Sequence, residues 1–189
     1  MDYKNLSTEE LFKIISPSSP PRQELKRRGV IRTANIVGEI GEFYTKKFFN
    51  KIDKKIYTTT KKLPNLTLAA PGTKNVDALG RDGKIYSIKC IAGKNRTTGS
   101  FWYPDKIRNN IKTFDYLIIL MLDFEYSVDK ILELSWDDFS KYKKYNKTMN
   151  NFQISVTNKM IDEYKIVYKK WPLDWYTIYT HSIHNQSTL

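Results

Sequence analysis

The stretch Tyr116-Leu117-Ile118-Ile119-Leu120-Met121-Leu122 decides the fold class of this 189-residue chain. Seven apolar residues in a row leave no polar position that could face water, so a strand formed here must be buried on both faces. The stretch is also far shorter than the roughly 20 residues that a membrane-spanning helix needs. We therefore expect a sheet with this strand inside it, and no membrane partner.

Hydrophobic periodicity places further elements around this strand. Together they predict an α/β fold with a central mixed β-sheet flanked by helices. The expected helices cover 11–15, 22–28, 33–50, 105–113, a segment starting at 136, and 157–164. The expected strands cover 56–68 (interrupted by a turn at 61–65), 75–79, 84–91, 130–134 and 152–156.

The chain divides at a breaker segment, Ser16-Pro17-Ser18-Ser19-Pro20-Pro21. Prolines fix φ and remove a backbone donor, so a helix cannot continue through this segment. We expect an N-terminal helix and Pro/Ser-rich linker over 1–21, capped by the pattern Ser7-Thr8-Glu9-Glu10, and a single domain over 22–189.

Charge is unevenly distributed along the chain, whose formal net charge is +12. Residues 1–112 hold 23 Lys and Arg against 10 Asp and Glu, whereas 113–189 hold 9 against 10. Drift towards lysine in an AT-rich genome would spread the charge evenly. The asymmetry favours a polyanionic partner, because lysine and arginine that neutralise phosphates release condensed counterions.

Cysteine content and the N-terminus indicate the compartment. Cys90 is the sole cysteine and cannot form an internal disulfide, and its strand position predicts a buried small hydrophobe. The N-terminus carries no apolar stretch of signal-peptide length. We expect a cytoplasmic protein.

Three polar side chains converge on the predicted hairpin over 76–91. Strand alternation places Ser87 and Lys89 on one face, with the apolar side chains of the same strand on the other. A two-residue turn would separate Asp77 from Lys89, whereas a three-residue turn with Gly83 at positive φ places Asp77 opposite Ser87. The sequence predicts the three-residue turn, because Gly83 stands where that turn needs a left-handed residue.

These residues suit a metal-dependent phosphodiesterase. Asp77 would bind Mg²⁺ as a hard oxygen ligand, with the backbone carbonyl of Ile88 as a second ligand and Glu42 completing the set from the helix over 33–50. Lys89 would orient the attacking water and stabilise charge on the phosphate. The alternative is a plain cross-strand ion pair between Asp77 and Lys89.

Glu42, Asp77 and the triplet Ser87-Ile88-Lys89 resemble the pattern of the PD-(D/E)XK nuclease superfamily, which includes most type II restriction endonucleases. The resemblance covers about 33–122 as a restriction-endonuclease-like core and leaves 123–189 as a C-terminal extension. It implies Mg²⁺ and double-stranded DNA as the substrate. A single domain of this length can hold one active site, so we expect a homodimer in which each subunit cuts one strand.

The sequence departs from the family pattern at two positions. Val76 replaces the usual proline, and Ser87 stands at the acidic position. Some members with serine there recruit a glutamate from elsewhere, a role open here to Glu42 or Glu39. Glu42 is preferred because it lies one helical turn beyond Gly38, with Glu39 expected to be solvated.

Two basic segments are candidate DNA contacts, although each of their residues could equally belong to a solvated surface. The segment before the long helix is expected to form a short helix ending at Gly29; the segment after the Lys89 strand also carries aromatic residues. The candidates are Arg22, Lys26, Arg27, Arg28, Arg32, Lys94, Asn95, Arg96 and Trp102.

The C-terminal segment adds no chemistry to this prediction. His181 and His184 have no accompanying metal-ligand cluster, so they are interpreted as tail residues. Nearby aromatics cap the core or form a dimer contact, and the sequence leaves both open; they are Trp171, Trp175, Tyr176 and Tyr179.

The sequence therefore predicts a Mg²⁺-dependent endonuclease of the type II restriction class that cuts a specific duplex site. A non-catalytic DNA-binding module on the same fold and a structure-specific nuclease such as a junction resolvase are the alternatives.

Overall fold

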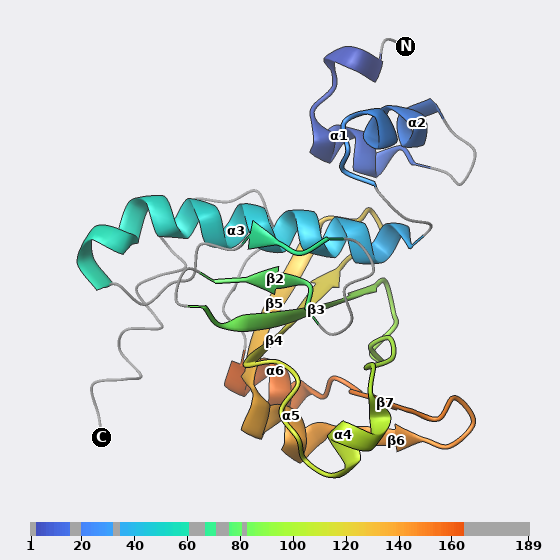
Figure 1. Cartoon of the computed structure of the whole chain (residues 1–189). Coiled ribbons are helices and arrows are strands. Elements are labelled where there is room, and N and C mark those ends of the chain that lie inside the picture. The colour runs from blue at the N-terminus through green and yellow to red at the C-terminus, as the bar shows by residue number, and fades with distance from the viewer. Residues whose placement is uncertain are drawn as a thin grey trace.

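The structure, a computed structural model, describes residues 3–15, 20–31, 35–60, 67–70, 76–80 and 83–164, with 13 and 50–60 described by backbone alone (Figure 1). Its helical elements are η1 Tyr3–Asn5, α1 Thr8–Lys13, α2 Pro20–Arg27, α3 Ile36–Thr60, α4 Pro104–Arg108, α5 Trp136–Tyr142 and α6 Asn158–Tyr164. Its strands are β1 Thr67–Leu68, β2 Ala78–Leu79, β3 Ile85–Ala92, β4 Tyr116–Leu122, β5 Val128–Ser135, β6 Lys144–Asn146 and β7 Asn151–Gln153.

Five strands form one mixed sheet in the order β1-β2-β3-β4-β5. β3 and β4 are parallel, and the other neighbouring pairs are antiparallel. The fold is α/β, as predicted. Among the described residues, no helix is both long enough and apolar enough to cross a bilayer.

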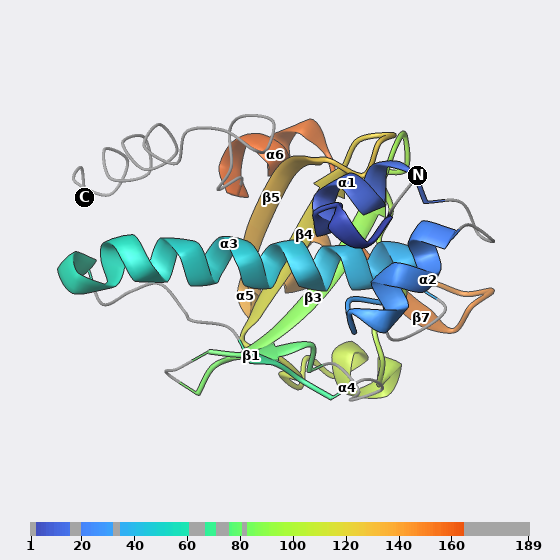
Figure 2. The ribbon, with the colours of Figure 1, turned by 90° about the horizontal axis from the view of Figure 1, so that it is seen from above.

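β4 is buried on both faces, as its unbroken apolar sequence predicted. Every side chain from Leu117 to Leu122 is at most 6% exposed. Ile118 and Leu120 belong to the core beneath α3, whereas Leu117 and Ile119 belong to the core on the opposite face. Helices therefore cover both sides of this strand (Figures 1 and 2).

α3 crosses one face of the sheet obliquely to β3, β4 and β5 (Figure 2). Gly41 permits this close approach, because a Cβ atom at this position would lie 2.5 Å from the Cβ atom of Cys90 on β3. Burial raises the pKa of the Cys90 thiol, in keeping with the predicted small hydrophobe. α3 is longer than the predicted helix and continues through 56–60, where the prediction of a strand is wrong. Each residue added to an existing helix gains a hydrogen bond, which here outweighs the β preference of Ile, Tyr and Thr.

The opposite face of the sheet is covered by α5 and α6, with α4 and the antiparallel pair β6–β7 beyond them (Figure 1). Aromatic rings fill this layer: the ring centroid of Phe139 lies 4.8 Å from that of Phe101 and 5.0 Å from that of Phe114. The predicted helix over 105–113 is shorter, because Asn110 adopts a left-handed φ of 55° soon after α4 ends. The strand β6 was not predicted.

The N-terminal helices have the predicted cap at Ser7 and the predicted stop at Gly29, but α1 already ends at Lys13 and α2 begins inside the predicted breaker segment, since proline is tolerated in the first turn of a helix. A capping box links Ser7 with Glu10 at the start of α1, and Gly29 has a φ of 69° just after α2. The Phe12 ring of α1 packs against Phe43 of α3 at 5.5 Å. α2 begins at Pro20, so the predicted division after residue 21 falls inside this helix; the two-part division of the chain stays a prediction.

Candidate active site

The hairpin of β2 and β3 has the predicted three-residue turn. Ala78 pairs with Tyr86, and the Gly80 amide donates to the Lys84 carbonyl at 2.9 Å, which leaves 81–83 as the connection. Gly83 has a φ of 75°, the left-handed conformation that favours glycine. The same register places Asp77 opposite Ser87.

The carboxylate of Asp77 is held by the strand that faces it. Its Oδ2 atom accepts hydrogen bonds from the Ser87 hydroxyl at 3.1 Å and from the Ile88 amide at 2.6 Å. Ser87 is fully buried, so its hydroxyl makes this contact away from water. Oδ1 receives no hydrogen bond from any described residue. The serine at the acidic position of the family pattern thus orients Asp77 and leaves one carboxylate oxygen accessible for a ligand.

The Ile88 carbonyl shares the edge of β3 with this carboxylate. The amide and carbonyl of a strand residue point to the same edge, and the Ile88 amide points towards Asp77. β2 pairs with β3 only as far as Tyr86, so no β2 residue is paired with Ile88. Two oxygen donors, Asp77 Oδ1 and Ile88 O, therefore lie on the same edge of β3.

Lys89 lies on the same face as Ser87 and is half-buried. Its Nζ atom is 5.2 Å from the ring centroid of Phe101. Among the described residues it makes no ion pair, so the alternative of a plain Asp77–Lys89 ion pair is not observed. An unpaired ammonium beside a backbone-anchored carboxylate suits a site for a phosphate group.

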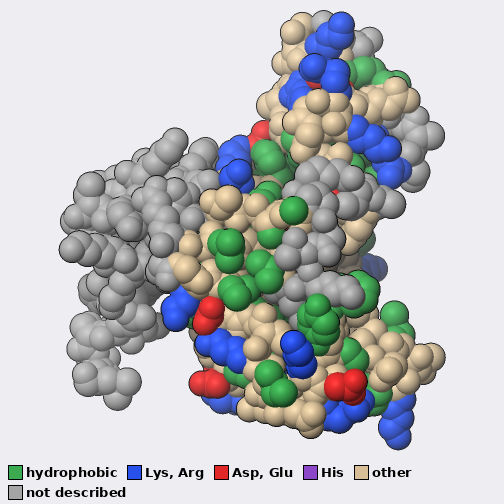
Figure 3. Space-filling model, in the orientation of Figure 1, with side chains coloured by type: hydrophobic (Ala, Val, Ile, Leu, Met, Phe, Trp, Pro, Cys, Tyr) green, Lys and Arg blue, Asp and Glu red, His purple; other side chains and the backbone are tan. Residues whose placement is uncertain are grey.

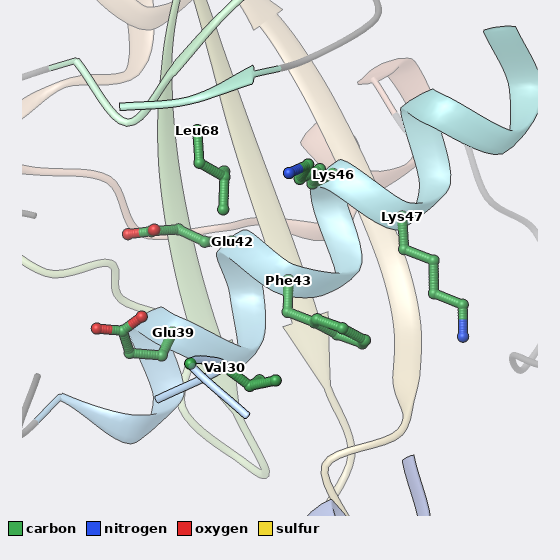
Figure 4. Close-up of a pocket in the computed structure, with 8 residues that line it drawn as sticks. Val30, Glu39, Glu42, Phe43, Lys46, Lys47 and Leu68 are labelled. Atoms are coloured by element: carbon green, nitrogen blue, oxygen red, sulfur yellow. The ribbon is translucent and has the colours of Figure 1, made fainter. Parts of the chain in front are cut away.

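Glu39 and Glu42 line a cavity of about 490 Å³ beside α3 (Figure 4). Leu68 on β1 closes one wall, and the neighbouring Ala69 amide donates to the Asp77 carbonyl at 2.8 Å. The expectation that Glu39 is solvated is wrong: its residue is 4% exposed, because the first turn of α3 lies against the chain that follows α2. Glu42 is half-buried and projects from the same side of α3 (Figure 4).

The oxygen atoms of Asp77 and Ile88 suit an ion that keeps most of its water ligands, such as Mg²⁺, and do not suit a metal that is bound by protein side chains alone. Within the described ranges, no three His, Cys, Asp or Glu residues are grouped closely enough to form a metal site. Glu42, Glu39 and Asp77 therefore do not make a common ligand set. Mg²⁺ commonly keeps several waters and binds only one or two protein carboxylates. Asp77 can supply one carboxylate oxygen, and the Ile88 carbonyl can supply a further oxygen.

Two candidate DNA contacts, Arg27 at the end of α2 and Arg28 directly after it, serve the fold. Nη2 of Arg27 and Nε of Arg28 lie 2.6 and 2.9 Å from the carboxylate of Glu24. Hydrogen bonds from Arg27 and then Arg28 lower the pKa of Glu24 to about 2. Arg28 also donates to the carbonyls of Leu6 and Lys4 at 2.7 and 2.8 Å, which ties α2 to the N-terminal segment.

The remaining candidate DNA contacts divide by exposure. Lys26, Lys94 and Arg96 are exposed, Arg22 is half-buried, and Trp102 is 58% exposed. The Asn95 side chain is occupied, because it both donates to and accepts from the Thr97 backbone at 3.0 Å. Predictions that fall outside the described residues concern Arg32, Trp171, Trp175, Tyr176, Tyr179, His181 and His184.

Sequence reasoning missed two features. The β6–β7 hairpin carries exposed Lys144 and Lys147, and its signal was the run 143–153, with three lysines and no acid, hidden in a half of near-zero net charge. Glu133 lies on β5 opposite Ile118, so it faces the α3 side of the sheet. Burial raises the pKa of Glu133 to about 7, and no signal in the sequence indicated this.

The sequence matches no protein-family model and no curated protein. Function is therefore inferred from the geometry of Asp77, Ser87, Ile88 and Lys89.

Proposed function

We propose that this protein is a Mg²⁺-dependent DNA endonuclease with a restriction-endonuclease-like core, which cuts a specific duplex site as a homodimer in the cytoplasm. One observation carries the proposal. The Asp77 carboxylate is fixed through one oxygen by Ser87 and the Ile88 amide, while its second oxygen accepts no hydrogen bond from the described residues.

Asp77 and the Ile88 carbonyl would hold the ion, and Glu42, which α3 carries over the other face of the sheet, would not belong to this ligand set. When bound there, Mg²⁺ supplies charge neutralisation at the phosphate and lowers the pKa of water. Ser87 contributes by orienting Asp77 and adds no negative charge. A site with this single acid should need a higher Mg²⁺ concentration than one with two acids.

Lys89 supplies the positive charge of the site. Its ammonium lies on the face that Asp77 and Ser87 share, and it is not neutralised by an acid of the described chain. Such a group stabilises negative charge that develops on phosphate oxygens and orients the attacking water. The Phe101 ring beneath Nζ restricts where the ammonium can lie.

A non-catalytic DNA-binding module is the second candidate. Ser87 at the acidic position and the lack of a three-residue acidic group within the described ranges favour it. Both functions predict binding to DNA, so cleavage separates them.

The test is incubation of supercoiled plasmid with Mg²⁺ and the wild-type protein, Asp77→Asn, Lys89→Ala or the control Lys159→Ala. Lys159 is on α6 and its side chain is 74% exposed, so its removal changes charge away from the site. We expect discrete fragments from wild type and control, with rates at least about 100-fold lower for both site variants. Circular dichroism checks that each variant is folded.

Other outcomes identify other functions. Duplex binding without cleavage in Mg²⁺ or Mn²⁺ would support the non-catalytic module, and cleavage of branched DNA alone would support a junction resolvase. Equal cleavage by wild type and Asp77→Asn would contradict the proposed site.

A further inference from the structure

We infer that the β6–β7 hairpin is the element that enters the major groove of duplex DNA; this inference rests on the proposed DNA substrate. The hairpin comprises β6, β7 and the connecting residues 147–150. It belongs to the half of the chain whose total charge suggested a scaffold.

A chain of contacts links the hairpin to Lys89. Phe101, which lies beneath Lys89, donates its amide to the Phe152 carbonyl on β7 at 3.1 Å. The Phe152 ring lies 5.3 Å from the ring of Tyr145 on β6, and the Arg108 guanidinium lies 4.9 Å over that second ring. A duplex in contact with the hairpin would therefore lie beside the lysine proposed to act on phosphate.

The exposed charge of the hairpin is not neutralised by protein. The side chains of Lys144 and Lys147 are exposed and make no ion pair or hydrogen bond with the described residues. The third lysine, Lys143, is used internally, since its Nζ atom donates to the Ile107 carbonyl at 2.8 Å. Two unpaired cations on a segment without acids complement a phosphate backbone.

Apolar side chains are exposed on the same part of the molecule. Figure 3 shows green apolar and blue basic side chains together where Figure 1 labels α4, β6 and β7. Of the eight large hydrophobic residues exposed in the described chain, five lie in α4, the residues next to it and the β6–β7 hairpin. This clustering is typical of a contact surface. The five residues are Trp102, Tyr103, Ile111, Tyr145 and Met149.

The hairpin has the dimensions and rigidity for this role. The major groove is about 12 Å wide and 8.5 Å deep and admits a two-stranded ribbon. Strands of three residues extend about 10 Å, enough to reach its floor. The Tyr145 hydroxyl donates to Asn150 at 2.6 Å and the Met149 amide to Asn146 at 3.1 Å, so the tip is preorganised. Met149, 57% exposed, would present an apolar group to base edges.

The test measures binding of a labelled duplex in EDTA across a salt series, which keeps it independent of cleavage. Lys144→Ala/Lys147→Ala is compared with the control Lys141→Ala/Lys159→Ala, whose lysines pair with Asp138 and Glu163. We expect the hairpin variant to bind at least about 10-fold more weakly at low salt, with the slope of log affinity against log salt reduced by about 1.8. The control should match wild type.

Failure of this inference is distinguishable from failure of the proposed function. If the folded hairpin variant has the affinity and salt slope of wild type, the inference about the hairpin is overturned. That result would not contradict the proposed nuclease activity. Duplex binding that depends on the hairpin but is never followed by cleavage would support the inference and count against the nuclease. A wild-type protein that binds no duplex would overturn both.

Discussion

Arg27 at the end of α2 and Arg28 directly after it lie 2.6 and 2.9 Å from one buried acid, Glu24, whereas Lys144 and Lys147 of the β6–β7 hairpin contact no acid of the described chain. The spacing of the first group explains the difference. Residues three and four apart on a helix share a face, so Glu24 meets both arginines. Residues 143–153 of the hairpin contain no acid at all.

The comparison teaches that formal charge and available charge are different quantities. In the first half of the chain the excess of 13 positive charges includes arginines that hold the N-terminal helices together. In the second half the near-zero total conceals two lysines with no acidic neighbour among the described residues. The regional charge predicted a polyanionic partner, but it did not indicate which lysine and arginine side chains would contact that partner.

We expect the largest effect from replacing Arg28, which directly follows α2 and ties it to the N-terminal segment. Arg28→Met removes the contact with Glu24 and leaves the Leu6 and Lys4 carbonyls without this donor. We expect the opening of α1 to become easier by about 3 kcal/mol, because several charge-assisted hydrogen bonds are lost together. Amide hydrogen exchange in α1 measures this opening.

Arg27→Met is the matched control, because Arg27 is the neighbouring residue and contacts the same Glu24 carboxylate. The Arg27 side chain is 67% exposed and its polar contacts within the described chain are with Glu24, so we expect a much smaller loss of α1 protection than for Arg28→Met. Equal protection of α1 in the two variants would show that Arg28 does not tie these helices together.

A second prediction extends the comparison to Glu133, an acid that forms no ion pair with the described residues. The pKa of Glu133 is raised to about 7 from 4.5. Between these values the folded state keeps a proton that the unfolded state releases, so stability falls as pH rises through this window. Glu133→Gln stays neutral and should be more stable than wild type by about 2 kcal/mol at pH 8.

Urea unfolding at pH 4 and pH 8 measures this difference. The two proteins should have similar unfolding free energies at pH 4, where both side chains are neutral in the folded state. A constant difference between wild type and variant at both pH values would instead indicate that Glu133 is ionised within the fold.

The smallest expected effect compares single charges of the two basic segments directly. Lys147→Gln should weaken duplex binding about fivefold at low salt, since it removes one available cation. Arg27→Gln removes the same formal charge but one already paired with Glu24, so we expect a change below about twofold. Titration of a labelled duplex provides both values, and a larger loss for Arg27→Gln would reverse the comparison.

Local patterns in the sequence predicted much of the fold. The apolar run of β4, the capping box of α1 and the stop at Gly29 are each set by neighbouring residues, and the structure contains all three. The turn at Gly83 followed from the need for positive φ. The helix end at Thr60 could not be predicted, because elongation of an existing helix competed with β-branched preference.

The candidate site was predicted in part. Alternation along β3 placed Ser87 and Lys89 on one face, and the turn placed Asp77 opposite Ser87. The burial of Glu39 and the engagement of Arg28 depend on segments that approach from elsewhere in the chain, and periodicity carries no such information.

The sequence by itself determined the central strands β3, β4 and β5, the turn that joins β2 to β3 and the polar groups that share a face of β3, because these follow from backbone sterics and side-chain alternation. Only the tertiary structure decided which charged groups contact distant segments, since such contacts depend on distances between parts far apart in the chain. It tied Arg28 to the N-terminal carbonyls and placed the Phe101 ring beneath Lys89. It also left Lys144 and Lys147 exposed on a hairpin whose Phe152 carbonyl accepts a hydrogen bond from the Phe101 amide.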